Sequence, residues 1–306
     1  MSGGRLLRRC GALLLTVLVV HALAFLLVRG TRGGPFDEER ELAPEVRAAL
    51  EERFGLRRPL HEQYFTALAG LARCDFGPSL RYRDTSVRAI LADSLPISLA
   101  VGAGALTIAL LLGVAAGLGA AQRGGFAEAL VLGGSTLLLA LPGFVLAGAA
   151  VLFFSFRLGW LPPAGFGGVR HLLLPWLCLG LPLAAQIARL AHGGAREVLA
   201  SAAVRAARAR GLSRRAVLRH HVLRPALVPV AAFFGPAAAA ALTGSLVIEQ
   251  VFALPGLGTH FVQAALNRDF TLALGATVVF TALLGLCTLL SDLMLARLDP
   301  RAEALT

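Results

Sequence analysis

The apolar residues of this chain fall into long runs instead of short amphipathic stretches. About 20 mostly apolar residues in a helix cross the hydrocarbon core of a membrane. Runs of that length, each bounded by charged or turn residues, predict six spans: Cys10–Val28, Leu95–Ala121, Ala129–Phe156, Leu172–Ala191, Ala226–Ile248 and Thr271–Ala296. We therefore expect an all-α membrane protein with six transmembrane helices.

The first run has two interpretations. Three arginines precede it (Arg5, Arg8 and Arg9), as in a cleaved signal peptide. Its apolar stretch is longer than the roughly 7–15 residues of such signals, and no A-x-A site follows it. We interpret it as a retained helix, with cleavage as the alternative.

The composition agrees with a membrane protein. The 306 residues are 57% hydrophobic and 15% charged, against about 25% charged residues in soluble domains. All 29 basic residues behind the net charge of +11 are arginines. Because a Walker A loop needs a lysine, the chain cannot hydrolyse ATP by that route. An aromatic content of 7% also argues against stacking on nucleic acid.

The arginines predict the orientation, because short arginine-rich loops stay in the cytoplasm. The loop 192–225 holds eight arginines and one acid, Glu197, whereas the segment 29–94 has eleven of each. We therefore place both termini and this loop in the cytoplasm, and the segment 29–94 outside. In domain terms, residues 1–94 are the first helix plus an extracytoplasmic segment, and residues 95–306 are a five-helix core with the loop 192–225.

The outer segment carries signals of two short helices. Pro44 suits a first helical position and Gly55 a left-handed cap, with Val46, Leu50 and Phe54 spaced along one face. A second pattern follows Pro59, with Tyr64, Leu68 and Leu71 at similar spacing, and it ends at Asp75-Phe76-Gly77-Pro78. We predict a small helical insertion, and both a docking role and simple packing on the helix ends remain open.

Catalytic or metal-binding groups do not emerge from the sequence. The ionisable residues of the spans, Arg189 and Asp292, lie near their ends, where such side chains reach the interface. His21 lies inside the first span, where packing is favoured over a proton relay. The four cysteines form no CxxC pair and the histidines no HExxH motif. We predict no catalytic residues, no metal and no cofactor.

The arginine-rich loop has internal order beyond what orientation requires. A helix with Leu199, Ala202, Ala203 and Ala206 along one face is followed by Gly211, which suits a left-handed cap. Ser213 can cap a second helix, which passes through Pro225 and Pro229 into the fifth span. A helix, a glycine and a helix with a small-residue ridge suit the groove of a partner protein; a loop that only fixes orientation is the alternative.

This loop resembles the EAA loop of permease subunits of ATP-binding-cassette importers, in the peptide-transporter branch. The patterns V-R-x-A-R-A-x-G-L and R-H-x-L-R-x-A-L-x-P of that branch correspond to Val204–Leu212 and to Arg219–Pro229, with His221 in the variable position. The glutamate that names the loop is Arg205 in this chain, a departure usual for the peptide branch.

Other segments resemble the oligopeptide permease of the membrane-B type. Taken singly each is weak, whereas their order along the chain is specific. They are Gly33–Asp37, Phe54–Leu56 with Gln63 and Tyr64, Asp75–Ser79, Gly244–Glu249, Leu254–Gly258 and Ala265–Asp269.

The resemblance implies a type I importer permease fold in the bacterial inner membrane and import of oligopeptides. It implies as partners a second homologous permease, two ATP-binding-cassette ATPases and an extracytoplasmic peptide-binding protein. The implied ATPase-coupling residues are Arg205, Ala206, Ala207, Arg208, Gly211 and Leu212. Residues Glu249, Leu254, Pro255, Gly256 and Gly258 are expected at an extracytoplasmic gate or binding-protein contact, with an ordinary re-entrant turn as the alternative.

Three alternatives remain open at this stage. Dipeptide, nickel and glutathione importers use similar permeases. A stand-alone carrier or channel would need intramembrane charges or inverted repeats, and we find neither. A membrane scaffold without transport would share the loop more readily than the outer motifs.

Overall fold

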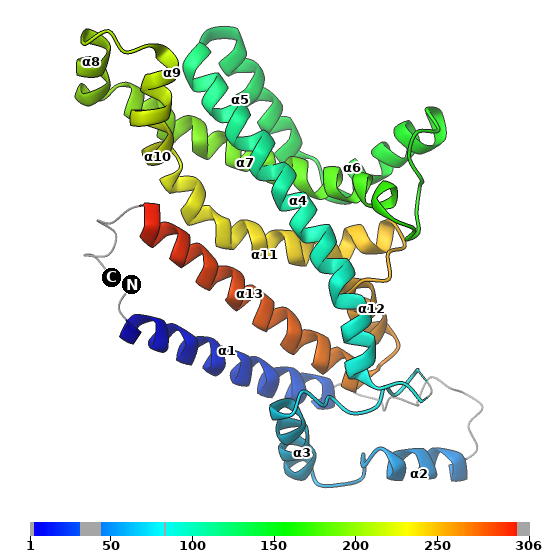
Figure 1. Ribbon diagram of the computed structural model, residues 1–306. Coiled ribbons are helices and arrows are strands. Elements are labelled where there is room, and N and C mark those ends of the chain that lie inside the picture. The colour runs from blue at the N-terminus through cyan, green and yellow to red at the C-terminus, as the bar shows by residue number, and fades with distance from the viewer. Residues whose placement is uncertain (1–2, 31–43, 83, 299–306) are drawn as a thin grey trace. The chain divides into compact units, whose positions relative to one another are not determined.

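The computed structural model describes residues 3–30, 44–82 and 84–298 (Figure 1). Within these ranges the chain is helical apart from turns and one isolated bridge between Pro78 and Ser86, so the predicted all-α class is confirmed. The predicted motif Gly33–Asp37 lies outside the described residues. The helices are α1 (Gly3–Gly30), α2 (Pro44–Arg53), α3 (Leu60–Ala72), α4 (Val87–Arg123), α5 (Gly125–Ala140), α6 (Gly143–Ala150), the π-helix η1 (Val151–Arg157), α7 (Val169–Leu199), α8 (Ala202–Ala209), α9 (Arg214–Val217), the π-helix η2 (Leu218–Val222), α10 (Leu223–Ala226), α11 (Val228–Val251), α12 (Leu257–Leu266) and α13 (Phe270–Leu298).

Five described helices are long and apolar enough to cross a membrane: α1, α4, α7, α11 and α13. The sixth predicted span, Ala129–Phe156, is not one straight helix. It consists of α5 and, after a short break, α6 with η1. These two parts are bent by 102° relative to each other at the break. Leu141 is extended there (ψ 126°) because the ring of Pro142 disfavours the helical conformation of the residue before it. Six spans result if this bent pair is one span.

The chain forms two compact units, each made of several segments. The first consists of Met1–Arg9, Ser98–Leu254 and Leu284–Thr306, and the second of Cys10–Ile97 and Pro255–Leu283. The predicted division into residues 1–94 and 95–306 stays a prediction.

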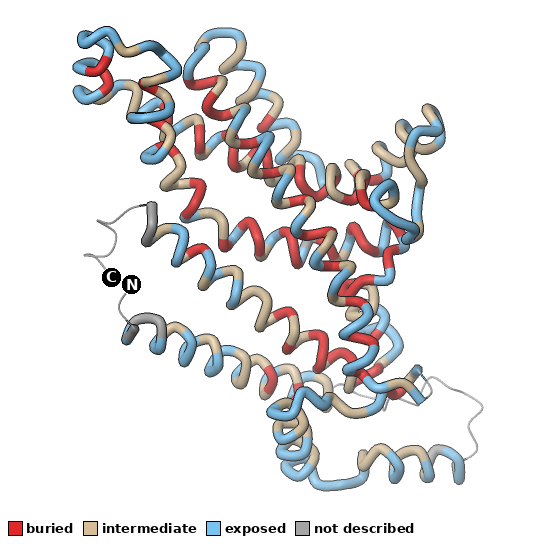
Figure 2. Tube along the Cα trace, in the orientation of Figure 1, coloured by how far each residue is buried: buried red, intermediate tan, exposed pale blue. Residues whose placement is uncertain are grey.

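In the first unit, α7 packs against α5, α6, α10 and α11, and buried positions recur along α7 and α11 (Figure 2). Gly113 and Gly117 of α4 allow α7 to approach closely. A Cβ at Gly117 would lie 2.3 Å from the carbonyl oxygen of Ala188, and one at Gly113 would lie 2.7 Å from that of Ala184. The two backbones therefore meet along a glycine seam.

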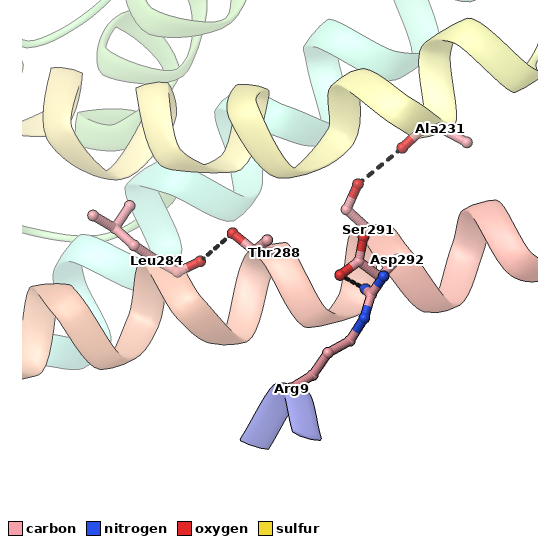
Figure 3. A network of polar contacts seen from close by, with 6 residues as sticks. All are labelled: Arg9, Ala231, Leu284, Thr288, Ser291 and Asp292. Carbon is pink, nitrogen blue, oxygen red and sulfur yellow. Dashed lines mark hydrogen bonds and ion pairs between the residues drawn. The ribbon is translucent and has the colours of Figure 1, made fainter. Parts of the chain in front are cut away.

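The first unit also contains a contact between the start of α1 and the last turns of α13. Arg9 of α1 forms an ion pair with Asp292 of α13 (Figure 3). The neighbouring Ser291 donates from its hydroxyl to the carbonyl of Ala231 in α11, 3.0 Å away. Both charges are only about one third exposed, with side-chain exposures of 38% and 31%. Asp292 therefore has a protein partner, whereas the sequence suggested only that it reaches the membrane interface.

In the second unit, the predicted insertion folds into α2 and α3. Gly55 takes the predicted left-handed conformation after α2, with φ of 65°. The ring of Tyr64 in α3 lies 5.6 Å from that of His21 and 5.3 Å from that of Phe25, both in α1. The packing role predicted for His21 is thus observed: the side chain is buried against the insertion.

Candidate functional site

The loop predicted to carry function is a short helix mounted on the end of α7. Ser201 begins α8, and its hydroxyl accepts a hydrogen bond from the backbone N–H of Val204. Gly211 follows the end of α8 and has a φ of 82°, which a residue with an L side chain rarely adopts. Ser213 then caps α9 by accepting from the N–H of Ala216, 3.3 Å away. The roles of Gly211 and Ser213 were predicted from the sequence, whereas the break between α7 and α8 with its cap at Ser201 was not.

A small hydrophobic core fixes α8 to the rest of the first unit. Val204 and Ala207 of α8 are fully buried, together with Val217 and Val222 of the segment that follows. They pack with Leu118, Ala121, Ala195 and Ala226, and Leu199 and Leu212 lie against this cluster. At its edge, a Cβ at Gly194 would lie 2.8 Å from the carbonyl oxygen of Ala226. The inner face of α8 therefore packs on α7, α9 and η2, in a cluster that residues of α4 and α10 complete.

One of the contact residues predicted for α8 is buried inside the chain. Ala207 was expected on the ridge presented to a partner, but it is 0% exposed and belongs to the chain's own core. The reason is helical spacing: Val204 and Ala207 lie three residues apart on the inner face. The outer face carries Ala202, Ala203 and Ala206, which are exposed. The predicted small-residue ridge thus exists without Ala207, and Leu199 belongs to the inner side.

Arginines surround the exposed alanines of α8. The guanidinium of Arg205 donates from Nη1 to the carbonyl of Ala200, at the end of α7. A cation at this position complements the negative end of the helix dipole. Arg208 and Arg210 are exposed beside the ridge. The outer surface of α8 is therefore small, apolar and bordered by positive charge.

A hollow of about 660 Å³ lies beside α8. Arg196, Arg208 and Arg214 line it, along with Leu199, Leu212 and Leu218. Three guanidinium groups over apolar walls suit a carboxylate side chain from a partner. Leu212 therefore faces both the chain's own core and this hollow.

Glu128 was missed by the sequence analysis. Its carboxylate Oε1 lies 2.8 Å from Nε2 of His192 and 3.8 Å from Nε of Arg196, so it joins the start of α5 to the end of α7. A signal was present, because Glu128 is the one acidic residue between Gln122 and Arg157. His192 and Arg196 are four residues apart, and therefore on one face of α7.

The predicted outer site is mostly interior. Glu249 is fully buried in the last turn of α11, where the hydroxyl of Ser98 donates to its Oε1 over 2.7 Å. A buried carboxylate of this kind needs such partners. Glu249 is therefore not an exposed binding-protein contact in this structure.

The stretch Leu254–Gly258 also differs from expectation. Leu254, Gly256 and Gly258 are buried, and Pro255 is exposed. Ala253, just before this stretch, has a left-handed backbone with φ of 48°, whereas Gly256 has φ of −90° and precedes α12. Buried side chains here pack inside the chain, which leaves Pro255 as the predicted contact that is accessible.

In the second unit, two predicted motifs meet at Asp269. Its buried carboxylate accepts from the hydroxyls of Ser79 and Thr271 and from the N–H groups of Leu80 and Leu272, the last 3.1 Å away. The hydroxyl of Thr271 also lies 2.8 Å from the carbonyl oxygen of Pro78, so its single proton is shared between these two acceptors. Asp75–Ser79 and Ala265–Asp269 are therefore parts of one structural junction, although nearly 200 residues separate them.

Comparisons with known proteins agree with the predicted family. The family described as "Binding-protein-dependent transport system inner membrane component" matches residues 109–304. The chain is 40% identical to the oligopeptide transport system permease protein OppB of Escherichia coli K12, over 97% of this chain and 98% of the relative. It is 40% identical to OppB of Haemophilus influenzae, over 94% of both chains. The dipeptide transport system permease protein DppB of Bacillus subtilis is 36% identical, over 97% of both chains.

These matches cover the loop 192–225, the bent pair and the junction at Asp269 together. They confirm a multi-pass membrane protein with the type I importer permease fold. The chain belongs to the family of binding-protein-dependent transport system inner membrane components.

Proposed function

We propose that this chain is the permease subunit of an ATP-driven importer that moves oligopeptides across the bacterial cytoplasmic membrane. The observation that carries the proposal is the 40% identity to oligopeptide permeases over nearly the whole chain. The dipeptide permease of Bacillus subtilis, at 36% identity, supports a second candidate, import of dipeptides.

The partners follow from the chemistry that this chain lacks. The sequence has no Walker A lysine, so ATP hydrolysis belongs to separate subunits. We expect two ATPases on the cytoplasmic side, a second homologous permease beside this chain, and a peptide-binding protein outside. Both termini face the cytoplasm, because the arginine-rich loop 192–225 does so.

The element α8 transmits force and does no chemistry. Its exposed alanines enter a groove of an ATPase, and Arg205, Arg208 and the Arg196–Arg208–Arg214 hollow meet acidic side chains there. When ATP closes the ATPase pair, α8 is carried along, and its core around Val204 and Ala207 passes the motion to α7. Gly211 and Leu212 hold the turn that fixes this helix. The motion opens the helix bundle outward.

The outer stretch has a different role in this proposal. Glu249, Leu254, Gly256 and Gly258 support the turn from within, and Pro255 is the candidate contact for the binding protein. An oligopeptide pathway that accepts many side chains needs a wide and weakly polar lumen, so few residues are specific for a substrate.

Reconstituted uptake tests the proposal. The complete complex is purified in mild detergent, placed in proteoliposomes with ATP inside, and given a radiolabelled tripeptide with its binding protein. Uptake that depends on ATP, and that unlabelled tripeptides suppress more than dipeptides, nickel or glutathione, is the expected result. Suppression by dipeptides alone would favour the second candidate. Uptake that continues without ATP would contradict both and favour a secondary carrier.

A further inference from the structure

The second unit contains a pocket that the proposed transport function does not use. Its volume is about 270 Å³, and it lies between α1, α3 and the start of α13. His21, Phe25 and Arg29 form one wall; they recur every four residues and thus share one face of α1. Arg58, Gln63 and Phe270 belong to the facing walls.

Buried polar atoms without a hydrogen-bond partner gather at this pocket. Besides Nη1 of Arg9, which pairs with Asp292, six buried side-chain nitrogen or oxygen atoms of the described residues have no hydrogen-bond partner, and three of them line this pocket: Nδ1 of His21, Nε of Arg29 and Oε1 of Gln63. The His21 side chain is only 4% exposed. Because an unsatisfied buried polar group destabilises the folded chain, a bound partner for these atoms would explain their presence.

The guanidinium of Arg29 is fixed in place by aromatic rings. Its central carbon lies 5.8 Å from the ring centre of Phe25 and 5.7 Å from that of Phe270. The contacts orient the planar group, and its Nε always donates. Among the described residues that line the pocket, Arg29 and Arg58 are accompanied by one acidic residue, Asp75, which leaves a net charge of +1. Its chemistry favours an oxyanion.

The place of Arg29 on α1 indicates the source of that oxyanion. Arg29 is in the last turn of a membrane-spanning helix, where phospholipid phosphates lie. Three residues before Arg29, and therefore beside it on α1, the apolar side chain of Leu26 is 61% exposed. An acyl chain can lie against this side chain while the headgroup enters the pocket.

We propose that this pocket binds the phosphate of a membrane phospholipid. Nε of Arg29 and Arg58 hold the phosphate oxygens. Oε1 of Gln63, already positioned by donation from Nε2 to the carbonyl of Arg58 at 2.7 Å, accepts from an amine or hydroxyl of the headgroup. Asp75 supports a headgroup amine. The proposal is independent of which substrate the importer carries.

Native mass spectrometry of the intact complex tests the proposal. Arg29→Gln removes the charge, and Ala67→Phe fills the pocket from α3. Arg57→Gln is the matched control, because Arg57 pairs with Glu51 on the surface and does not line the pocket. Wild type and Arg57→Gln should retain one more phospholipid per permease than the two pocket variants. Dihexanoyl-phosphatidylethanolamine should bind the delipidated wild type about tenfold or more tightly than it binds Arg29→Gln.

Two further arms separate the possible sources of the oxyanion. Inorganic phosphate and trialanine are added at millimolar concentration to the lipid-bound complex, and neither should displace the lipid. Equal lipid retention by wild type, Arg29→Gln and Ala67→Phe would overturn the proposal. Displacement by phosphate or by the peptide would overturn it in favour of a free anion or a transported peptide. If Arg29→Gln fails to fold, Ala67→Phe against Arg57→Gln still decides.

Discussion

The glycine seam between α4 and α7 makes a sharp prediction about stability. In Gly117→Ala, the new Cβ would lie 2.3 Å from the carbonyl oxygen of Ala188 and 2.9 Å from Cβ of Ala191, whereas ordinary contacts begin at 3.4 Å. The nearest atom belongs to backbone inside a helix and cannot rotate away. The helices must therefore separate by about 1 Å, and such overpacking costs about 1–3 kcal/mol.

The matched control is two residues away on the same helix. A Cβ at Gly119 meets no atom within 4 Å, so Gly119→Ala adds only the preference of alanine for the helix, about 0.5–1 kcal/mol in favour of folding. Thermal unfolding followed by circular dichroism in one detergent should give a lower midpoint for Gly117→Ala and an equal or higher one for Gly119→Ala. Equal midpoints for both variants would refute the close packing of α4 on α7.

Three other predictions concern Gly211 in the loop 192–225, Asp269 at the junction, and His260 in α12. Gly211→Val should lower peptide-stimulated ATP hydrolysis several-fold because its φ of 82° excludes a branched side chain, whereas Gly211→Asn should keep most of it, since asparagine tolerates this region. Asp269→Ala should lower the thermal midpoint, because the hydroxyl and N–H groups that it binds lose a buried acceptor, while Asp93→Ala, at an exposed position inside α4, should not; equal midpoints would contradict the junction. Burial lowers the pKa of His260 in the folded chain below its usual 6.5. As the pH falls, the imidazole is therefore protonated in the unfolded chain before it is protonated in the folded chain. Stability should therefore decline as the pH falls below 6.5, and His260→Gln should reduce that decline in melts at pH 7.5 and 5.5.

Local sequence signals were sufficient to predict several helix starts and ends in the loop 192–225 and in the insertion after α1. Gly55, Gly211 and Ser213 predicted the ends and starts of helices, because these residues satisfy backbone requirements that act over a few positions. The six apolar runs correspond to five long apolar helices and the bent pair, because a helix needs about 20 apolar residues to cross the hydrocarbon core. The bend after Leu141 was present in the sequence as Pro142, but its angle of 102° depends on neighbouring helices.

The candidate site was less predictable, because burial depends on which face of a helix meets its neighbours. Ala206 and Ala207 are equivalent in the sequence, and the cluster around Val204 decides that only Ala206 faces outward. Glu249 and Asp269 were read as parts of outer motifs, yet both are buried and hydrogen-bonded to serines distant in the sequence. Such partners require the folded chain.

Site-directed cross-linking tests the central claim, that the exposed face of α8 docks on an ATPase. Single cysteines at Ala206 and Ala207 are compared in a chain with Cys10 and Cys74, its exposed native cysteines, replaced by serine. In native membranes, a short bifunctional reagent should join Ala206→Cys to a Walker-containing ATPase and leave Ala207→Cys unjoined, because Ala206 is exposed and Ala207 is 0% exposed. No ATPase adduct at Ala206→Cys, or equal adducts at both positions, would contradict the account.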